Sequence, residues 1–373
     1  MKVLLVLILL SVDVFCRKDK SKHKLQTNTS EYVINPKSFR GLVSTNDSLF
    51  NNVKESTKRA TMDVSRNSAG SHGSGLKVNN STMLFLRSPI STKLIPVIYT
   101  VVVLIGLPAN AIILWMLFYR VRSVCTAIFY TSLAISDLLF CLMLPFKIVY
   151  HLNGNHWIFG EAMCRATTSF FYGNMYCSIL LLTCISISRY IAIVHPFVYR
   201  SLPKRNLAIL MCALVWVTVL MYMIPFFTTK QTYYLKQLDI NSCHDVLDSA
   251  GGTFQFYYFL LLAVFGFLVP FSIVTFCYFS IIRALGTHDQ KRFWYLKVTI
   301  LLLAIFSICF TPSNIILIIH QVRLHYSNTD YTYSWYLMAL CMSSLNSCLD
   351  PFLYFLMSKV TNPTKNYVTI IRL

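Results

Sequence analysis

Charged side chains, and acidic ones above all, are scarce in this sequence. Only 13% of its 373 residues are charged and 14 are Asp or Glu, whereas 55% are hydrophobic. A soluble globule of this length needs more polar surface, because its outer shell must face water. The composition therefore excludes an ordinary soluble fold and indicates a chain whose apolar surface faces lipid.

The sequence also lacks the short motifs on which most catalysis depends. It contains no metal-ligand cluster, nucleophile motif or phosphate-binding loop. It shows no internal repeat and no helix interrupted near mid-membrane, the two features that a seven-helix channel or transporter would have. These absences argue against an enzyme with a cofactor and against a transporter.

Positive charge, in contrast, is abundant, with a formal net charge of +19. Such a charge is typical of proteins that neutralise nucleic-acid phosphates. Here the basic residues gather in a polar tail and in short turns between apolar runs, which is a membrane-topology pattern. We therefore expect membrane lipid, and no nucleic acid, as a partner.

The first 93 residues differ in composition from the rest. Lys2, the apolar run 3–12 and the small residue Cys16 are typical of a secretory signal peptide at 1–16, and the run is too short to span a bilayer. The polar stretch 17–93 lacks periodicity, so we predict a flexible extracellular tail. Four N-x-Ser/Thr acceptors agree with this location and predict a glycoprotein: Asn28, Asn46, Asn79 and Asn80.

Seven apolar stretches follow, each about 20 residues or longer and able to cross about 30 Å of hydrocarbon. We predict an all-α membrane protein with a seven-transmembrane helix bundle at 94–357 and a short tail at 358–373. The positive-inside rule makes the basic turns cytoplasmic, so the amino terminus is extracellular, the carboxyl terminus is cytoplasmic and the plasma membrane is the expected location. The predicted spans are 94–119, 127–150, 162–194, 207–227, 254–285, 295–321 and 333–357.

Most of the 12 cysteines lie in or beside these stretches, where they act as small buried hydrophobes. Two stand apart, because Cys164 begins the third stretch and Cys243 lies in the long connection before the fifth. An oxidising compartment permits a disulfide between them, which would tie this connection to a helix end.

Motifs in successive stretches resemble, in order, those of the rhodopsin-type receptors. They are Gly106 with Asn110, LAISD at 133–137, Ser188-Arg189-Tyr190, Trp216, Pro270, CFTP at 309–312 and DPFLY at 350–354. The resemblance implies a receptor for heterotrimeric G proteins, in which Arg189 holds the inactive bundle and later contacts the G protein. Pro312 and Pro351 would be hinges of this switch, and Tyr190 and Tyr354 would also belong to it. The sequence departs from the family pattern at Ser188, where an acid is usual.

Asp137 and Asp350 are carboxylates inside apolar stretches, where an unpaired charge is costly. Each must be protonated, hydrogen-bonded or neutralised by a cation. The resemblance implies a sodium ion in the inactive state, with Ser178, Asn346 and Ser347 as polar partners. A water-filled network, or a proton shared between the two acids, is the alternative.

The connection around Cys243, CHDVL at 243–247, closely resembles that of the proteinase-activated receptors, and so do 146–148, 151–155 and 344–348. These receptors carry their agonist in their own tail. The resemblance implies that thrombin or a related trypsin-like serine protease cuts after Lys37, removes 17–37 and frees the amine of Ser38. Tethering gives an effective concentration of roughly millimolar, so even a weak peptide can act. The tethered ligand would comprise Ser38, Phe39, Arg40, Gly41, Leu42 and Val43.

For the ligand pocket we expect Phe39 to enter the bundle mouth near Tyr333 and Tyr336. Arg40 or the new amine would approach Asp245, beside His244. The alternative is that His244 and Asp245 only stabilise the loop and that the tyrosines form part of an interfacial belt.

The segment 46–52, after the cleavage site, has few acids to engage thrombin's basic exosite. A related trypsin-like protease is therefore an alternative to thrombin. Ser188 and the short carboxyl tail favour an alternative function, a co-receptor that presents thrombin to a neighbouring receptor within a heterodimer. A receptor for a diffusible peptide is a third hypothesis. The family resemblance further implies the Gq class of G proteins and a role in blood coagulation and haemostasis.

Overall fold

The computed structural model describes residues 43–44, 77–78, 80–120, 124–244, 252–285, 290–327 and 333–361. By its contacts the chain divides into two units, Met1–Ile34 and Asn35–Leu373, and every described residue belongs to the second. The signal peptide, the cleavage site and most of the tethered ligand predicted above lie outside the described residues.

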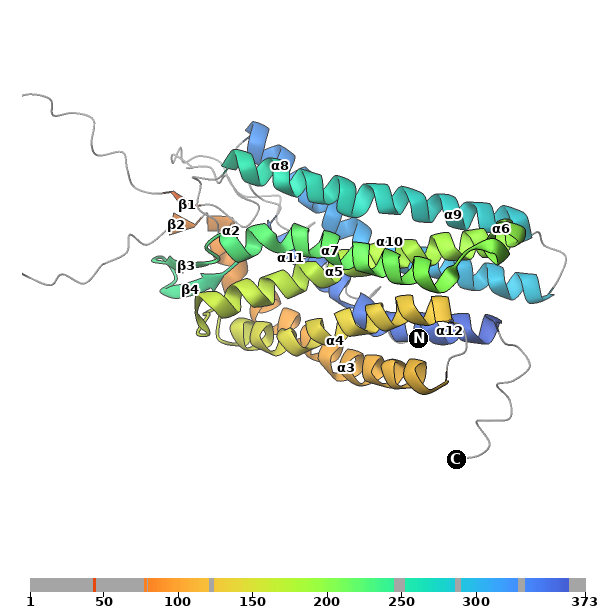
Figure 1. Ribbon diagram of the computed structural model, residues 1–373. Coiled ribbons are helices and arrows are strands. Elements are labelled where there is room, and N and C mark those ends of the chain that lie inside the picture. The colour runs from red at the N-terminus through yellow and green to blue at the C-terminus, as the bar shows by residue number, and fades with distance from the viewer. Residues whose placement is uncertain are drawn as a thin grey trace, which may run out of the picture. The chain divides into compact units, whose positions relative to one another are not determined.

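Long apolar helices make up most of this second unit (Figure 1). In lipid a backbone N–H or C=O must find its partner within its own segment, so such runs fold as helices. The long helices are α3 (Ile95–Arg120), α4 (Val124–Leu152), α5 (Gly160–Val194), α7 (Lys204–Thr228), α8 (Gly252–Ala263), α9 (Val269–Leu285), α10 (Gln290–Ser327), α11 (Tyr333–Ser344) and α12 (Asn346–Thr361). Shorter helices are α2 (Asn80–Arg87), α6 (Pro196–Ser201) and the π-helical turns η2 (Ile90–Leu94) and η4 (Val264–Leu268).

Six continuous helical stretches in the described part of the chain are long and apolar enough to cross a membrane, with hydropathies from 1.9 to 2.5. They are Ile90–Tyr119, Ala127–Leu152, Gly160–Val194, Lys204–Thr228, Phe256–Ala284 and Lys297–Arg323. They match the first six predicted spans to within a few residues. Helices α11 and α12 together supply the seventh crossing, so the predicted all-α seven-helix fold is confirmed.

The seventh crossing is not one continuous helix, and the expectation that no helix is interrupted is wrong. Leu345 lies in a turn between α11 and α12. Its N–H donates to Met342 O at 3.2 Å, and Cys348 N–H donates to Leu345 O at 3.0 Å, so the local bonds span three residues. Ser344 Oγ donates to Cys341 O at 2.6 Å. Side chains that bond the backbone in this way compete with regular helix, which explains the break.

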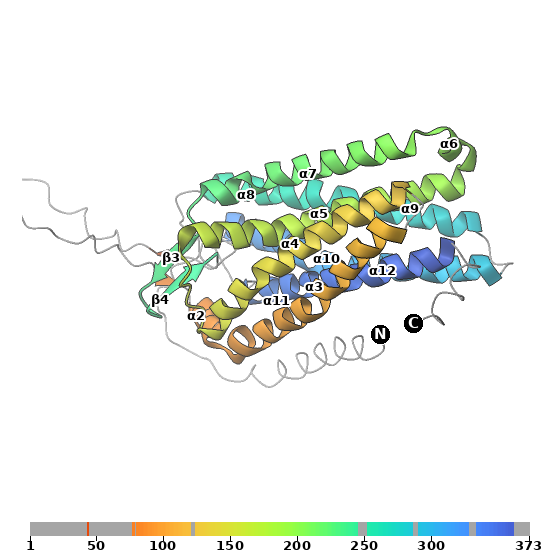
Figure 2. The ribbon, with the colours of Figure 1, turned by 60° about the horizontal axis from the view of Figure 1, so that its bottom comes forward.

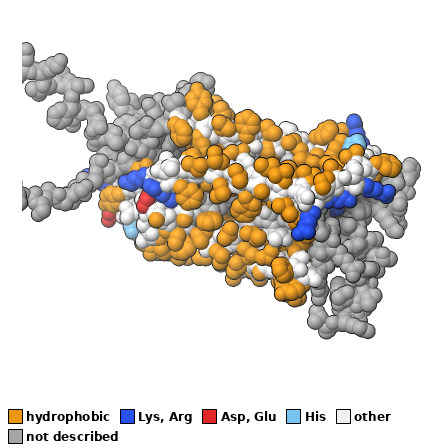
Figure 3. All heavy atoms as spheres, viewed as in Figure 1, with side chains coloured by type: hydrophobic (Ala, Val, Ile, Leu, Met, Phe, Trp, Pro, Cys, Tyr) orange, Lys and Arg blue, Asp and Glu red, His pale blue; other side chains and the backbone are white. Residues whose placement is uncertain are grey.

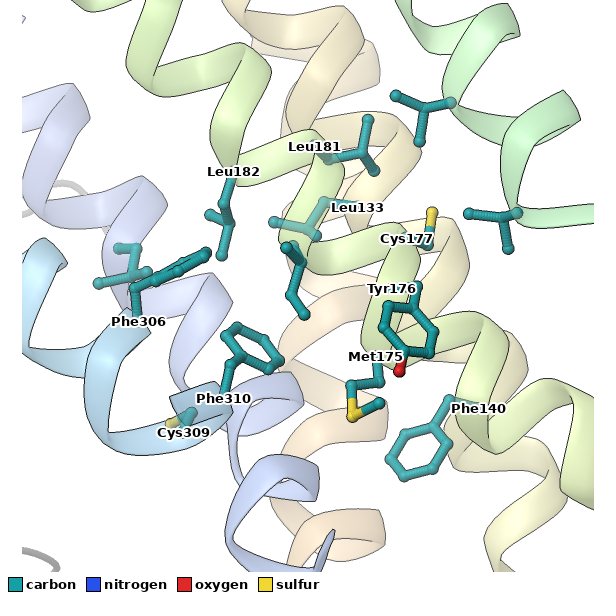
Figure 4. Packing of buried hydrophobic residues seen from close by; sticks show 14 of the residues in the cluster. Leu133, Phe140, Met175, Tyr176, Cys177, Leu181, Leu182, Phe306, Cys309 and Phe310 are labelled. Carbon is teal, nitrogen blue, oxygen red and sulfur yellow. The ribbon is translucent and has the colours of Figure 1, made fainter. Parts of the chain in front are cut away.

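Helix α5 is the central element of the bundle, because it packs against α4, α7 and α9 and also contacts α10 (Figure 2). Its side chains Met175, Tyr176 and Leu182 belong to one core cluster with Phe306 and Phe310 of α10 (Figure 4). Hydrophobic side chains also cover the outside of the helices, whereas Lys and Arg gather towards the two ends (Figure 3). An apolar outer surface of this extent suits lipid rather than water.

Two short antiparallel strand pairs complete the described chain. Strands β3 (Thr232–Leu235) and β4 (Ile240–Cys243) form a hairpin in which Thr232 faces Cys243. Strand β1 (Val43–Ser44) pairs with β2 (Lys77–Val78), which ends two residues before α2 begins. Below, the end of the bundle that carries the β3–β4 hairpin is called the hairpin end, and the opposite end, at which α5 leads into α6, is called the Arg189 end.

Candidate functional site

The β3–β4 hairpin is joined covalently to the helix bundle. Cys243, the last residue of β4, forms a disulfide with Cys164 near the start of α5, with a Cα–Cα distance of 5.8 Å. This is the pair named from the sequence. Both cysteines are fully buried and pack with Tyr150 and Trp157. The disulfide fixes the end of β4 directly over the bundle.

A single carboxylate, Glu161 in the first turn of α5, holds the other strand of the hairpin. Its Oε1 accepts hydrogen bonds from Arg165 Nε at 2.6 Å and from Gln231 N–H at 2.8 Å. Its Oε2 accepts from the N–H of Thr232 at 2.8 Å and from the hydroxyl of the same residue. Hydrogen bonds to a charged acceptor are the stronger ones, so Glu161 anchors the start of β3.

A chain of buried polar side chains runs from the hairpin into the bundle. His244 Nδ1 lies 2.8 Å from Gln231 Oε1, and His244 Nε2 lies 3.0 Å from the Tyr172 hydroxyl. The Tyr172 hydroxyl lies 3.0 Å from that of Tyr336 in α11. The exposed fractions of His244, Tyr172 and Tyr336 are 9%, 2% and 1%, and Phe226 stacks on the Tyr172 ring at 4.8 Å. We call His244, Tyr172 and Tyr336 the closing triad, because together they fill the hairpin end.

The structure thus brings two of the four predicted pocket residues together, His244 and Tyr336. The residue that joins them, Tyr172, is not among the sequence-predicted site residues. Of the other two, Tyr333 is the first residue of α11, and Asp245 lies outside the described residues. Among the remaining predicted positions, Val43 lies in β1 and Asn80 begins α2. Lys37, Ser38, Phe39, Arg40, Gly41, Leu42, Asn28, Asn46 and Asn79 lie outside the described residues.

Deeper in the bundle, the predicted sodium-site residues lie on α4, α5 and α12 and are buried. Asp137 and Ser178 are fully buried, and Asp350 is 3% exposed. Among the described residues, both oxygens of Asp137, the Ser178 hydroxyl and one oxygen of Asp350 have no hydrogen-bond partner. Such atoms are satisfied by a water, by an ion or by a proton shared between the two carboxyls.

Other polar side chains around this cluster are already paired. Asn346 Nδ2 donates to Asp350 Oδ2 at 2.7 Å, while its own Oδ1 has no partner among the described residues. Asn174 Nδ2 donates to Ser347 Oγ at 3.0 Å, and Ser136 Oγ donates to Asn174 Oδ1 at 2.7 Å. A small cavity beside them is lined by Asn174, Ser178, Asn346 and aromatic side chains. The oxygens left over are hard ligands that fit a small cation.

Three of the predicted switch residues, Arg189, Tyr190 and Tyr354, lie towards the Arg189 end. Arg189 and Tyr190 lie in the last turns of α5, and the Tyr190 hydroxyl lies 3.1 Å from His195 Nε2. Tyr354 in α12 is buried against Tyr130 of α4, with ring centroids 5.3 Å apart. Pro312 lies inside α10 and Pro351 inside α12, where a proline removes one backbone hydrogen bond.

Comparison with known proteins agrees with this arrangement. Residues 109–354 match the family described as 7 transmembrane receptor (rhodopsin family). Proteinase-activated receptor 3 of Homo sapiens is 54% identical over 365 residues, which cover 97% of each chain. Proteinase-activated receptor 3 of Bos taurus is 61% identical over 302 residues, 80% of each chain. Proteinase-activated receptor 2 of Bos taurus is 40% identical over 297 residues, 76% of this chain and 74% of its own.

The matched range 109–354 runs from the first membrane crossing to the last. The chain belongs to the rhodopsin family of seven-transmembrane receptors and, within it, to the proteinase-activated receptors, which are receptors and not enzymes.

Proposed function

We propose that this chain is a plasma-membrane receptor that thrombin or a related serine protease activates by cutting after Lys37. The new amino end, Ser38-Phe39-Arg40, is the agonist, and it acts on the bundle to which it is joined. The hairpin end faces the outside of the cell and the Arg189 end faces the cytoplasm. The observation that carries this proposal is the closing triad, which fills the mouth that the agonist must enter.

The chemistry of the closing triad suits a cationic, aromatic peptide end. Its hydroxyl and imidazole groups satisfy one another in the uncut chain, so the mouth stays closed. A free amine or guanidinium donates stronger hydrogen bonds than a neutral hydroxyl, and it can therefore replace them. The Phe39 ring would then stack among aromatic side chains such as Phe226.

Because Tyr172 lies in α5 and Tyr336 in α11, opening the triad changes the contact between these two helices. A ligand that binds only the open arrangement shifts the population towards it. The shift would reach Asp350 and Pro351 in α12, which follows α11, and then the Arg189 end. A G protein of the Gq class is the expected partner there.

Cells that lack other proteinase-activated receptors provide the direct test. We expect thrombin to release the tail and raise intracellular calcium through this chain, and Lys37→Ala to abolish both effects. Arg59→Ala removes a competing basic residue of the tail and should leave the response intact. Sequencing the new amino terminus identifies the cut bond. A full protease response from Lys37→Ala would overturn the proposal.

Ser188, where the family usually has an acid next to the switch arginine, favours a second candidate function. In this alternative the chain binds thrombin and presents it to another family member in a heterodimer, with little signalling of its own. The two candidate functions predict different calcium responses in cells that lack other proteinase-activated receptors. Tail release without calcium, restored when a second family member is added, would select the co-receptor.

We also propose that a sodium ion occupies the cluster around Asp137 in the inactive state. Asp137, Ser178, Asn346 and Asp350 would hold it, since each has an oxygen atom without a hydrogen-bond partner in the described part of the chain. The ion would supply the positive charge that two neighbouring buried carboxylates lack, and it would favour the closed bundle.

A further inference from the structure

The segment just before the first crossing is fixed to the bundle by one buried asparagine, Asn155. Asn155 follows Gly154 in the turn after α4, has a positive φ of 64° and is fully buried. Its Nδ2 donates to Leu86 O at 2.6 Å and lies 3.0 Å from Ser91 Oγ, while its Oδ1 lies 2.7 Å from His151 Nδ1. Asn155 therefore joins α2, η2 and α4 at one point.

The same segment is held by an apolar contact on its other side. Leu86, near the end of α2, is 2% exposed and packs against Leu235 of β3, which is fully buried. Partly buried Tyr233, Leu238 and Ile240 of the hairpin surround this pair. Helix α2 also contacts α11. The root of the amino-terminal tail is thus fixed at the hairpin end, beside the mouth that the closing triad fills.

A strand pair brings the agonist segment to this root. Val43, directly after residues 38–42, faces Val78, and Ser44 faces Lys77. Val78 in turn lies two residues before α2 begins. The strands join the two ends of the connection 45–76. The length of this connection therefore does not separate the agonist segment from α2.

Pairing shortens the distance that the freed amine must search. From a fixed Val43, residues 38–42 extend at most about 17 Å. Without pairing, a free chain from Ser38 to the start of α2 at Asn80 has a root-mean-square length of about 36 Å. The volumes of these two regions differ by roughly tenfold, and the effective concentration of the tethered end differs by the same factor.

We propose that β1, β2 and the Asn155 anchor form a clip that holds the agonist segment beside the mouth before and after cleavage. The clip consists of Val43, Ser44, Lys77, Val78 and Asn155. This inference rests on the proposed function for the identity of the agonist. It assigns to β2 and to Asn155 a positioning role, in which neither contacts the protease or the pocket.

Disulfide trapping in the full chain tests the register of the strands. Val43→Cys with Val78→Cys, and Ser44→Cys with Lys77→Cys, place two thiols opposite each other on one face of the pair. After mild oxidation, a cut at a protease site inserted between residues 45 and 76 should leave the tail fragment attached in both variants. Val43→Cys with Lys77→Cys points the thiols to opposite faces and should release it. Equal retention or equal release in all three variants would overturn the clip.

A binding competition tests the positioning role and does not depend on signalling. The probe is a fluorescent peptide with the sequence of residues 38–43 and a free amine, bound to membranes that carry the full chain. Cutting after Lys37 should weaken probe binding, because the tethered end competes. Val78→Pro removes a strand N–H and should reduce this self-competition about tenfold at equal tail cleavage, whereas Ser65→Pro in the connecting loop should not.

The outcomes separate the inference from the proposed function. A probe that does not bind the uncut chain would show that residues 38–43 are not the agonist, while the trapping result would still report on the clip. Alternatively, the probe binds the uncut chain, and the cut Val78→Pro chain displaces it as strongly as the cut wild-type chain does. That result would overturn the positioning role and leave the agonist assignment in place.

Discussion

Tyr172 is the residue on which the hairpin end depends most. Its hydroxyl contacts His244 from the hairpin and Tyr336 from α11, and all three side chains are buried. Removing this hydroxyl takes one hydrogen bond from each of two buried polar groups, at a cost of about 1–3 kcal/mol each. We expect Tyr172→Phe to lower the thermal unfolding midpoint of the purified receptor by several degrees.

Tyr234→Phe is the matched control for this prediction. The Tyr234 side chain is 45% exposed, and its hydroxyl donates to Asp239 within the hairpin turn. Its loss should change the midpoint by less than about a degree, since exposed groups exchange one partner for water. Equal shifts in the two variants would show that the closing triad contributes nothing to stability.

Glu161 offers a second prediction at this scale. Four donors converge on its two oxygens, and Glu161→Gln replaces one oxygen by an NH2 group that faces a donor. Losing one such bond costs about 1–3 kcal/mol, so local opening becomes roughly tenfold more frequent. Hydrogen exchange at the amides of Gln231 and Thr232 should accelerate by this factor. Asp239→Asn, in the turn of the same hairpin, should leave these two amides unchanged.

The residues that hold the hairpin end together differ in whether their roles could be predicted from the sequence. Cys164 and Cys243 could be identified because Cys164 begins an apolar stretch and Cys243 lies within the long polar connection, whereas most other cysteines lie in or beside the apolar stretches. Tyr172 could not, since a tyrosine in an apolar stretch has the same local sequence whether its hydroxyl is paired or faces lipid headgroups. Asn155 is likewise ordinary as a turn residue, and its role depends on Leu86 and Ser91, which are distant in the sequence.

Among the elements, the π-helical turn η4 packs closely against α5. Gly266 lies within it, and a Cβ added there would meet the Tyr176 ring of α5 at 2.7 Å and 2.8 Å. Overpacking of this kind costs about 1–3 kcal/mol. We expect Gly266→Ala to lower the thermal midpoint by several degrees.

Gly173→Ala in α5 tests the same chemical change where space is available. A Cβ there would meet Met223 at 3.7 Å and Val219 at 3.8 Å, which are ordinary contacts. Alanine is favoured over glycine in a helix by up to about 1 kcal/mol, so this variant should be neutral or slightly stabilised. The two variants should therefore differ in sign, and equal destabilisation would contradict the close packing of η4 on Tyr176.

At the scale of elements, the six continuous crossings were predictable because length and apolarity alone decide whether a helix spans lipid. The interruption at Leu345 was not predicted, although Ser343, Ser344, Asn346 and Ser347 surround it. Such side chains either bond the backbone or face a partner on another helix, and local sequence does not decide between the two. Here both occur, because Ser344 Oγ donates to the backbone of its own helix and Ser347 Oγ accepts from Asn174 Nδ2 in α5.

At the scale of the whole molecule, the described residues include a cluster of unsatisfied polar groups around Asp137 in the bundle interior and a closed polar network at the hairpin end. The closing triad satisfies its own hydrogen bonds, whereas the cluster around Asp137 leaves oxygens without partners among the described residues. Helices α11 and α12, which meet at Leu345, connect the two regions. A ligand at either region therefore changes the free energy of the other when it binds only one arrangement of these helices.

Sodium tests this coupling through the stability of the entire bundle. An ion present at tenfold above its dissociation constant stabilises the state that binds it by about 1.4 kcal/mol. We expect the thermal midpoint of the uncut receptor to be higher in sodium chloride than in choline chloride at equal ionic strength. Asp137→Asn should lose this difference and Ser178→Ala should reduce it, because the first removes the charged ligand and the second only a hydroxyl. Asp239→Asn, an acid on the exposed hairpin, should retain it. Equal midpoints in the two salts for the wild-type chain would mean that the two buried carboxylates are satisfied by a proton or by water, and that no sodium ion couples the cluster to the closed mouth.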